Sequence, residues 1–189
     1  MSKINVNTIA NASGTNALTV DSSGNIASTQ PIIQVAVFAR VGINSYNSGD
    51  FRDRVFNRIQ SGSITGATVN GSGSAVLPAG TYFIQYTANC VSDSGQQGET
   101  VSRLYDNAAS AIVANSYSVR ATQAADSTDS SLNIGSIQVT FGAQAEIIIQ
   151  TLSENGNFLD ANTFDGSPGN ALSNNDARIG MQMTVMKLA

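Results

Sequence analysis

From residue 31 onward, apolar side chains recur at every second position in short runs, and Gly, Asn and Ser residues separate these runs. A period of two is the period of a β-strand, because successive side chains point to opposite faces. The runs cover residues 33–41, 81–91, 101–105, 112–119, 132–141, 145–152 and 179–188. Strands at this spacing with short polar turns predict an all-β, antiparallel sandwich or jelly roll.

Two of these runs are apolar on both faces, namely residues 145–152 and the closing run through Met186 and Leu188. The outer face of a small sandwich is normally wet, so a second apolar face implies that something covers it. Packing against other subunits is the simplest cover. The residues expected at such a subunit interface are Ile148, Met181, Met183, Met186 and Leu188. The methionines are interpreted as filler of the core or of a trimer axis, because flexible thioethers adapt to irregular gaps.

Residues 50–60 are the one helical candidate, because Phe51, Val55 and Ile59 recur every four residues. An irregular extended segment is the alternative. The aromatic and arginine residues of this segment form a candidate docking segment: Phe51, Arg52, Arg54, Phe56 and Arg58. Arg and aromatic side chains are enriched at interface cores. The competing interpretation is a connector whose Phe side chains fill the end of the sandwich while its Arg side chains stay in water.

Composition excludes several function classes. The chain has no His and one Cys, Cys90, so it has no Ser-His-Asp or Cys-His mechanism, imidazole zinc site or intrachain disulfide. Charged residues make up 12%, about half of the usual ~25%, and the net charge is −4, which argues against nucleic-acid binding. No apolar run reaches the roughly 18 residues of a membrane span. We therefore expect no enzyme activity, no cofactor and no membrane partner.

Acidic residues lie mainly in the loops of the second half. Residues 160–166 carry several oxygen-bearing side chains before a Gly and so resemble a calcium loop, but their spacing misses the EF-hand pattern by one residue, and turn formation is the default interpretation. Whether a calcium ion is bound stays open at this level. Paired carboxylates that would hydrolyse a glycan need a defined separation, and no spacing here identifies such a pair.

Residues 1–30 differ from the rest and cannot make a core alone, because their apolar residues are isolated in an Asn-, Ser- and Thr-rich context. Two extended pieces, 17–21 and 25–27, flank a turn at 22–24. This stretch is expected to be an N-terminal arm that attaches the protein to a larger assembly, with residues 31–189 as the jelly-roll domain. The apolar residues of the arm are Ile4, Val6, Ile9, Leu18, Val20 and Ile26.

Several short segments resemble a known group of proteins. Residues 77–84 (LPAGTYFI) look like the start of a central strand in bacteriophage fibre domains of the tumour-necrosis-factor and complement-globular-head type. Residues 54–59 (RVFNRI), 101–106 (VSRLYD) and 181–188 (MQMTVMKL) are similar to three further segments of those domains. The leader segments 6–14 and 18–26 are similar to N-terminal segments of phage structural proteins.

The resemblance implies a jelly roll of about ten strands that forms a compact homotrimer, with terminal strands near the three-fold axis. It also implies a virion component, whose partners are other virion proteins such as the major capsid protein or a tail component. Because the first residues lack the apolar run of a secretory signal, we expect assembly in the host cytoplasm.

Three functions remain open from the sequence. The first is a capsid decoration or cement protein. The second is a short tail fibre or fibre tip that recognises a host surface glycan or protein through loops such as 92–98 and 155–175. The third is a carbohydrate-binding β-sandwich unrelated to a virion, because jelly rolls host many functions.

Overall fold

The computed structural model describes residues 8–10, 16–20, 23, 26–28, 33–41, 45–46, 49–92, 98–122, 130–153, 158–159 and 179–188. The chain divides into two compact units. One consists of Met1–Ile33 together with Ala189, and the other is Gln34–Leu188. The described part holds no helix that is long and apolar enough to span a bilayer.

The first unit carries a small antiparallel sheet of three strands, β1 (Thr8–Ala10), β2 (Asn16–Val20) and β3 (Ile26–Ser28). Ile9 pairs with Leu18, and Val20 pairs with Ile26. Ser23 lies in the turn between β2 and β3. The two extended pieces and the turn predicted within residues 17–27 are therefore confirmed.

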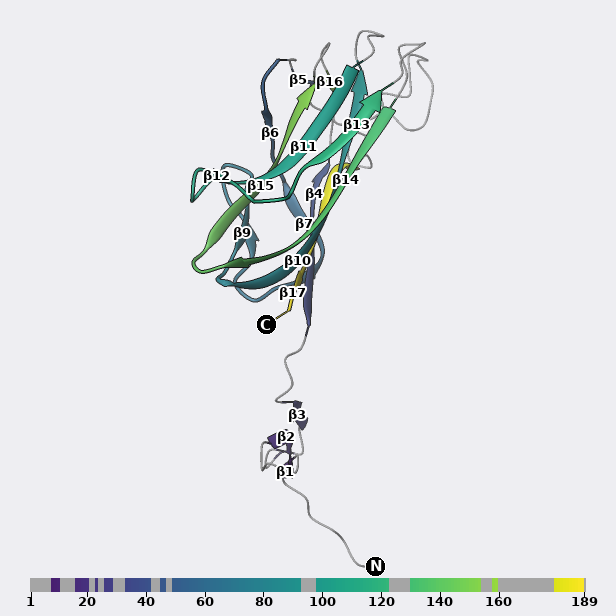
Figure 1. Ribbon diagram of the computed structural model, residues 1–189. Coiled ribbons are helices and arrows are strands. Elements are labelled where there is room, and N and C mark those ends of the chain that lie inside the picture. The colour runs from purple at the N-terminus through teal and green to yellow at the C-terminus, as the bar shows by residue number, and fades with distance from the viewer. Residues whose placement is uncertain are drawn as a thin grey trace, which may run out of the picture. The chain divides into compact units, whose positions relative to one another are not determined.

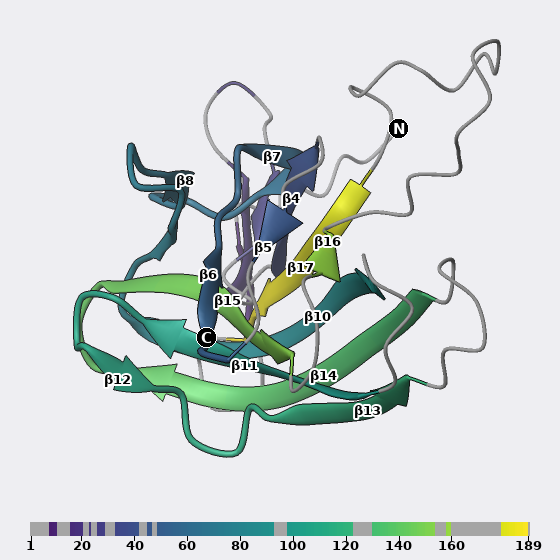
Figure 2. The same ribbon diagram turned by 90° about the horizontal axis from the view of Figure 1, so that it is seen from above.

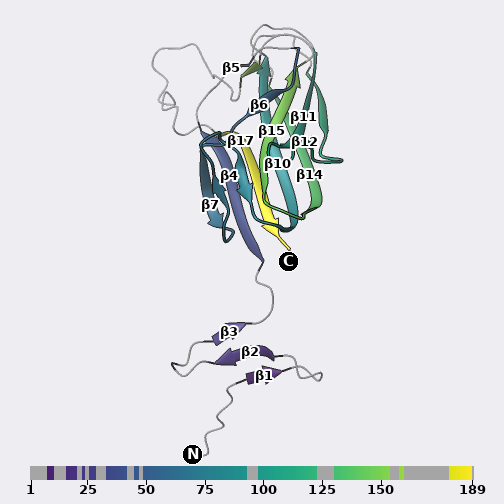
Figure 3. The ribbon, with the colours of Figure 1, turned by 90° about the vertical axis from the view of Figure 1, so that its left-hand side faces the viewer.

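The second unit is a sandwich of two antiparallel sheets (Figure 1). The order across the first sheet is β7 (Arg58–Ser63), β4 (Gln34–Val41), β17 (Ile179–Lys187), β10 (Gly80–Ser92) and β14 (Ser130–Phe141). Figure 3 shows β7, β4, β17 and β10 side by side in this sheet. Two short strands complete the sheet: β16 (Phe158–Leu159) pairs with the last two residues of β10, and β5 (Ser45–Tyr46) pairs with β16.

The second sheet is built on β11 (Gly98–Asp106) and β15 (Ala145–Ser153), which pair along seven residue positions from Thr100↔Ser153 to Asp106↔Ile147. The strands β12 (Ala111–Ile112) and β13 (Ser118–Thr122) pair with β11. The strands β6 (Arg52–Arg54) and β9 (Ala75–Leu77) pair with β15, and β8 (Thr68–Val69) pairs with β9. Along one edge of the sandwich, β13 runs beside β14 of the first sheet (Figure 2).

The core lies between the two sheets and is contributed by every second residue of each long strand. In the first sheet the inward residues form cross-strand rows, such as Phe38, Met183 and Tyr86, because directly paired residues share a face. In the second sheet Leu104, Ile147 and Ile149 face them, and all of these side chains are buried. The sandwich is thus closed by apolar packing, which is the main favourable term in folding.

A chain of buried polar side chains crosses this core near β13. Asn133 on β14 accepts a hydrogen bond from Thr100 Oγ1 (3.2 Å) and donates one to Ser102 Oγ (2.8 Å). Ser102 Oγ in turn lies 2.9 Å from Thr151 Oγ1 on β15. Buried polar groups cost free energy when they lack partners. These hydrogen-bonded side chains therefore hold the two sheets together in the one alignment that pairs all of them.

The predicted all-β jelly-roll sandwich is confirmed in its class, and most strands lie where the alternation places them. The helical interpretation of residues 50–60 is wrong, and the extended alternative holds, because β6 and β7 occupy this segment. The run 112–119 is not one strand. A turn with a left-handed Asn115 (φ 60°) separates β12 from β13, and the amide of Val113 donates to Leu104 O (3.0 Å).

Candidate functional site

The outward side of the first sheet is uncharged across β4, β17, β10 and β14, and it is bordered on β7 by the exposed Arg58, which pairs with Ala39. The strand pairings align its residues in three rows that cross β4, β17, β10 and β14. The first row is Val35, Met186, Phe83 and Gln138; the second is Val37, Thr184, Gln85 and Ser136; the third is Ala39, Gln182, Thr87 and Ile134. We call these rows, together with Leu132, the uncharged face. It contains only apolar, amide and hydroxyl side chains.

Large apolar side chains on this face are open to solvent in the single chain. The exposed fraction is 40% for Phe83, 38% for Leu132 and 53% for Ile134. A shallow depression of about 200 Å³ lies among Ile134 and four polar neighbours from β10 and β17. Leu132 and Ile134 are neighbours on the outward side of β14, whereas the row of Gln85 and Ser136 separates Phe83 from them. Three large exposed apolar side chains on one sheet face make this face the candidate interaction surface.

The structure places the five residues expected at a subunit interface in three different environments. Met181 and Met183 lie in the core of the single chain, with exposed fractions of 1% and 0%. Ile148 is also fully buried, on the opposite face of β15 from Ile147 and Ile149, and pairs with Tyr105. Met186 belongs to the uncharged face and, like Leu188, is only partly buried. Of the five, Met186 and Leu188 thus keep surface that a second subunit could cover.

The candidate docking segment is divided between the interior and the surface. Arg54 and Phe56 are buried, and the Phe56 ring packs against Phe38 with ring centroids 5.9 Å apart. Phe51 and Arg52 are partly exposed and Arg58 is exposed. The structure therefore corrects both interpretations of this segment in part. Phe56 fills the sandwich as the connector interpretation expects, but Arg54 does not stay in water.

An arginine on the outer side of the second sheet is held by aromatic rings. The guanidinium carbon of Arg103 lies 3.6 Å from the ring centroid of Phe51, and 6.0 Å from those of Tyr105 and Tyr117. Arg103 Nε donates to Gln150 Oε1 (2.9 Å), and Gln150 Nε2 donates to Asp53 Oδ1 (2.7 Å). We call this group the Arg103 cluster. Tyr117, with half of its surface exposed, gives the cluster an aromatic side chain that a ligand could reach.

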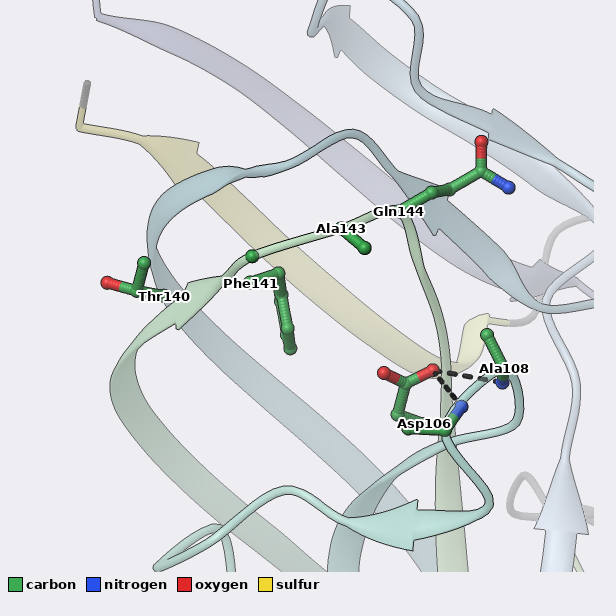
Figure 4. Close-up of a pocket in the computed structure, with 8 residues that line it drawn as sticks. Asp106, Ala108, Thr140, Phe141, Ala143 and Gln144 are labelled. Atoms are coloured by element: carbon green, nitrogen blue, oxygen red, sulfur yellow. Dashed lines mark hydrogen bonds between the residues drawn. The ribbon is translucent and has the colours of Figure 1, made fainter.

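A second concave region lies at the turn between β14 and β15, with a volume of about 340 Å³ (Figure 4). Asp106 is the one carboxylate in its lining. Oδ1 of Asp106 accepts hydrogen bonds from the amides of Ala108 (3.0 Å), Ala109 (3.4 Å) and Glu146 (3.0 Å). These three bonds tie the β11–β12 turn to the start of β15. A single carboxylate bound in this way lacks the partner that general acid–base chemistry on a glycan requires.

Two tyrosines join the core to the backbone of the sandwich. Tyr86 Oη donates to the carbonyls of Ser102 (3.0 Å) and Ser116 (2.5 Å), and Tyr82 Oη donates to Pro78 O (2.7 Å). Burial raises the pKa of both phenols above the ordinary value of 10.0, because the charged phenolate is poorly solvated inside the protein.

No cluster of three metal-ligating side chains occurs among the residues that the structure describes.

Several expected features lie outside the described residues. They are Ile4, Val6, the acidic loop 160–166, and most of the loops 92–98 and 155–175. Ile9, Leu18, Val20 and Ile26 lie on the strands of the first unit. The sequence pattern does not mark Phe83, Leu132 or Ile134 as surface residues. Alternation placed them on strands, but which side of each strand faces outward depends on pairings between distant segments.

No protein-family model and no curated protein matches the sequence. Among solved structures, the chain is similar to Eiger TNF from S. frugiperda, with a TM-score of 0.50 and 9% identity over 84% of this chain and 94% of that one. It is also similar to the globular domain of the zebrafish complement 1qA protein, with a TM-score of 0.46 and 8% identity over 84% and 98%. The first likeness shows the fold, an all-β jelly roll of the tumour-necrosis-factor type. Neither protein is a phage protein.

Proposed function

We propose that this chain is a non-enzymatic structural protein that assembles as a homotrimer through the uncharged face. The observation that carries the proposal is the set of three cross-strand rows without a charged side chain. A protein surface normally mixes both signs of charge, and the cores of interfaces are depleted of charged residues.

The chemistry of the face favours another copy of the same chain as its partner. A charged partner would leave its own ions unpaired against this surface, which costs free energy. A copy of the uncharged face offers the same apolar, amide and hydroxyl groups, and closed symmetric homo-oligomers are the commonest assemblies of soluble proteins. β17 lies in the middle of the face, in keeping with terminal strands near a three-fold axis.

At the finer level, we propose a phage virion protein that decorates or cements the capsid and is assembled in the host cytoplasm. The support is the resemblance of residues 77–84, 101–106 and 181–188 to phage fibre domains, and of the leader to phage structural proteins. Residues 1–30 act as the attachment arm, and the jelly roll carries the trimer contacts. The chain's division after Ile33 is compatible with this assignment.

A tail fibre or fibre tip that binds a host surface glycan or protein is the second candidate. The Arg103 cluster favours it, because an exposed aromatic ring such as that of Tyr117 beside a fixed guanidinium is typical of ligand contacts. A carbohydrate-binding sandwich outside any virion would use the same cluster, but it would not need the uncharged face to be covered.

The native mass of the purified protein, measured by light scattering at two concentrations, tests the assembly. We expect the mass of three chains of 19.6 kDa at both concentrations. A monomer at both concentrations would contradict the proposed trimer and leave the uncharged face without its partner.

A further inference from the structure

A third concave region, with a volume of about 340 Å³, contains one arginine and no acidic residue. We call it the Arg40 pocket. Its wall is formed by Arg40 at the end of β4, by Val55 and Phe56 after β6, and by Val69 with the turn that follows β8. This volume is in the range of pockets that hold small ligands.

Arg40 forms no ion pair in the described part of the chain. No hydrogen bond or ion pair of its side chain is found there, and its Nε is buried without a partner. The other polar side chains in the lining, Asn57, Asn70 and Ser72, are neutral. A guanidinium that is partly withdrawn from water and unpaired costs free energy, and an anion bound at its terminal nitrogens would offset that cost.

The turn opposite Arg40 is held in place before any ligand arrives. The Asn70 side chain accepts hydrogen bonds from the amides of Ser72 (3.2 Å) and Ser74 (2.8 Å), and the Gly73 amide donates to Asn70 O (3.0 Å). Gly73 O accepts from the amide of Phe56 (2.7 Å). A Cβ at Gly73 would lie 2.4 Å from Val55 Cβ, so only glycine fits there. A rigid wall reduces the ordering cost of binding.

We propose that the Arg40 pocket binds a small organic carboxylate with a compact apolar body. The carboxylate accepts hydrogen bonds from the terminal nitrogens of Arg40, which match its planar geometry. The apolar body contacts Val55 and Val69. This proposal does not depend on trimer formation, because Arg40 lies on the side of β4 opposite the uncharged face, paired with the core residue Met181.

Titration of the ¹⁵N-labelled full-length protein with benzoate tests the proposal, with inorganic phosphate as a second probe. We expect saturable shifts of the Gly71 and Gly73 amides and of the Arg40 Nε–H signal with benzoate, and weaker effects of phosphate, which lacks an apolar body. The variant Arg40→Gln should bind benzoate about tenfold more weakly or worse, because a hydrogen-bonded charge pair is lost.

The matched control is Arg58→Gln, which removes the same charge from an exposed arginine outside the pocket lining. It should retain the affinity for benzoate. The Arg40→Gln spectrum also reports whether the fold is kept. The proposal is overturned if benzoate gives no saturable shift, if phosphate binds as tightly as benzoate, or if both variants lose affinity equally.

Discussion

Gly135 on β14 lies directly against the ring of Tyr86 on β10. A Cβ built on Gly135 would approach Tyr86 Cε1 to 2.3 Å, Cζ to 2.4 Å and Oη to 2.6 Å. The two residues are paired in the sheet, and both are buried. The ring therefore occupies the volume that any larger residue at position 135 would need, and the hydroxyl is fixed by the carbonyls of Ser102 and Ser116.

The substitution Gly135→Ala is expected to lower the free energy of unfolding by about 1–3 kcal/mol, because the added methyl group overpacks the core and displaces the Tyr86 ring. Urea denaturation followed by circular dichroism measures this change. Gly142→Ala is the matched control, since a Cβ there meets nothing within 4 Å. Equal stability of the two variants would show that the ring can move aside without loss.

The substitution Tyr86→Phe removes the single O–H donor that the carbonyls of Ser102 and Ser116 share, and it leaves the ring in place. We expect a loss of about 1–3 kcal/mol, the cost of leaving buried acceptors unpaired. Tyr117→Phe, at an exposed position, should change the unfolding free energy by less than about 0.5 kcal/mol. A Tyr86→Phe protein as stable as the parent would indicate that water replaces the hydroxyl.

The free energy of unfolding should fall at alkaline pH, because two tyrosines are buried with their phenols protonated. Burial raises the pKa of Tyr86 and Tyr82 in the folded chain, so the unfolded chain loses these phenol protons at lower pH than the folded chain does. The stabilisation is thus complete below pH about 10 and is lost as the pH rises from there toward the folded-state pKa. Urea midpoints between pH 8 and 11 measure the slope above pH 10, which should be smaller in Tyr86→Phe. An unchanged slope in that variant would assign the loss to other groups.

The substitution Ile134→Asp should convert the proposed trimer to a folded monomer, because each copy would bring a charge into a dry contact. Sedimentation velocity would report the mass, and circular dichroism the fold. Ile112→Asp changes a similarly exposed apolar residue on β12 of the second sheet and should leave the assembly intact. A trimeric Ile134→Asp protein would show that the uncharged face is not the interface.

Deletion of residues 1–30 should leave the jelly roll folded and trimeric but prevent its incorporation into particles. The jelly-roll core and both of its sheets lie in the unit Gln34–Leu188, so the deletion removes none of their packing. Co-sedimentation of the truncated and full-length proteins with particles assembled without this protein would measure attachment. Normal incorporation of the truncated protein would contradict the role of the arm.

Strand positions could be predicted from the sequence because alternation is a local signal, and β10, β14, β15 and β17 all lie where the apolar period places them. Which side of each strand faces the core could not be predicted as well. In β4 the uniformly apolar side, with Val35 and Val37, points outward, whereas the mixed side, with Ala36 and Phe38, enters the core. The choice depends on pairing with β17, more than 130 residues away, which no local pattern encodes.

The same limit separates Met183 from Met186. Both lie on the closing strand and both are apolar, yet the first contributes to the core of one subunit and the second to the uncharged face. Arg54 is a further case, because composition favours an exposed arginine and the structure buries it completely. The Arg103 cluster joins residues from β11, β15 and the start of β6, so it exists only after these strands have paired.

The central position of β17 also determines when the first sheet can fold during synthesis of the chain. Its partners β4 and β10 emerge from the ribosome well before residues 179–187, and each lacks one neighbour until those residues arrive. The first sheet can therefore close only after nearly the whole of this sequence has been translated, and the nascent chain exposes two unpaired strand edges in the meantime. The uncharged face forms in the same step, so the proposed trimer can assemble only from subunits that have each folded completely.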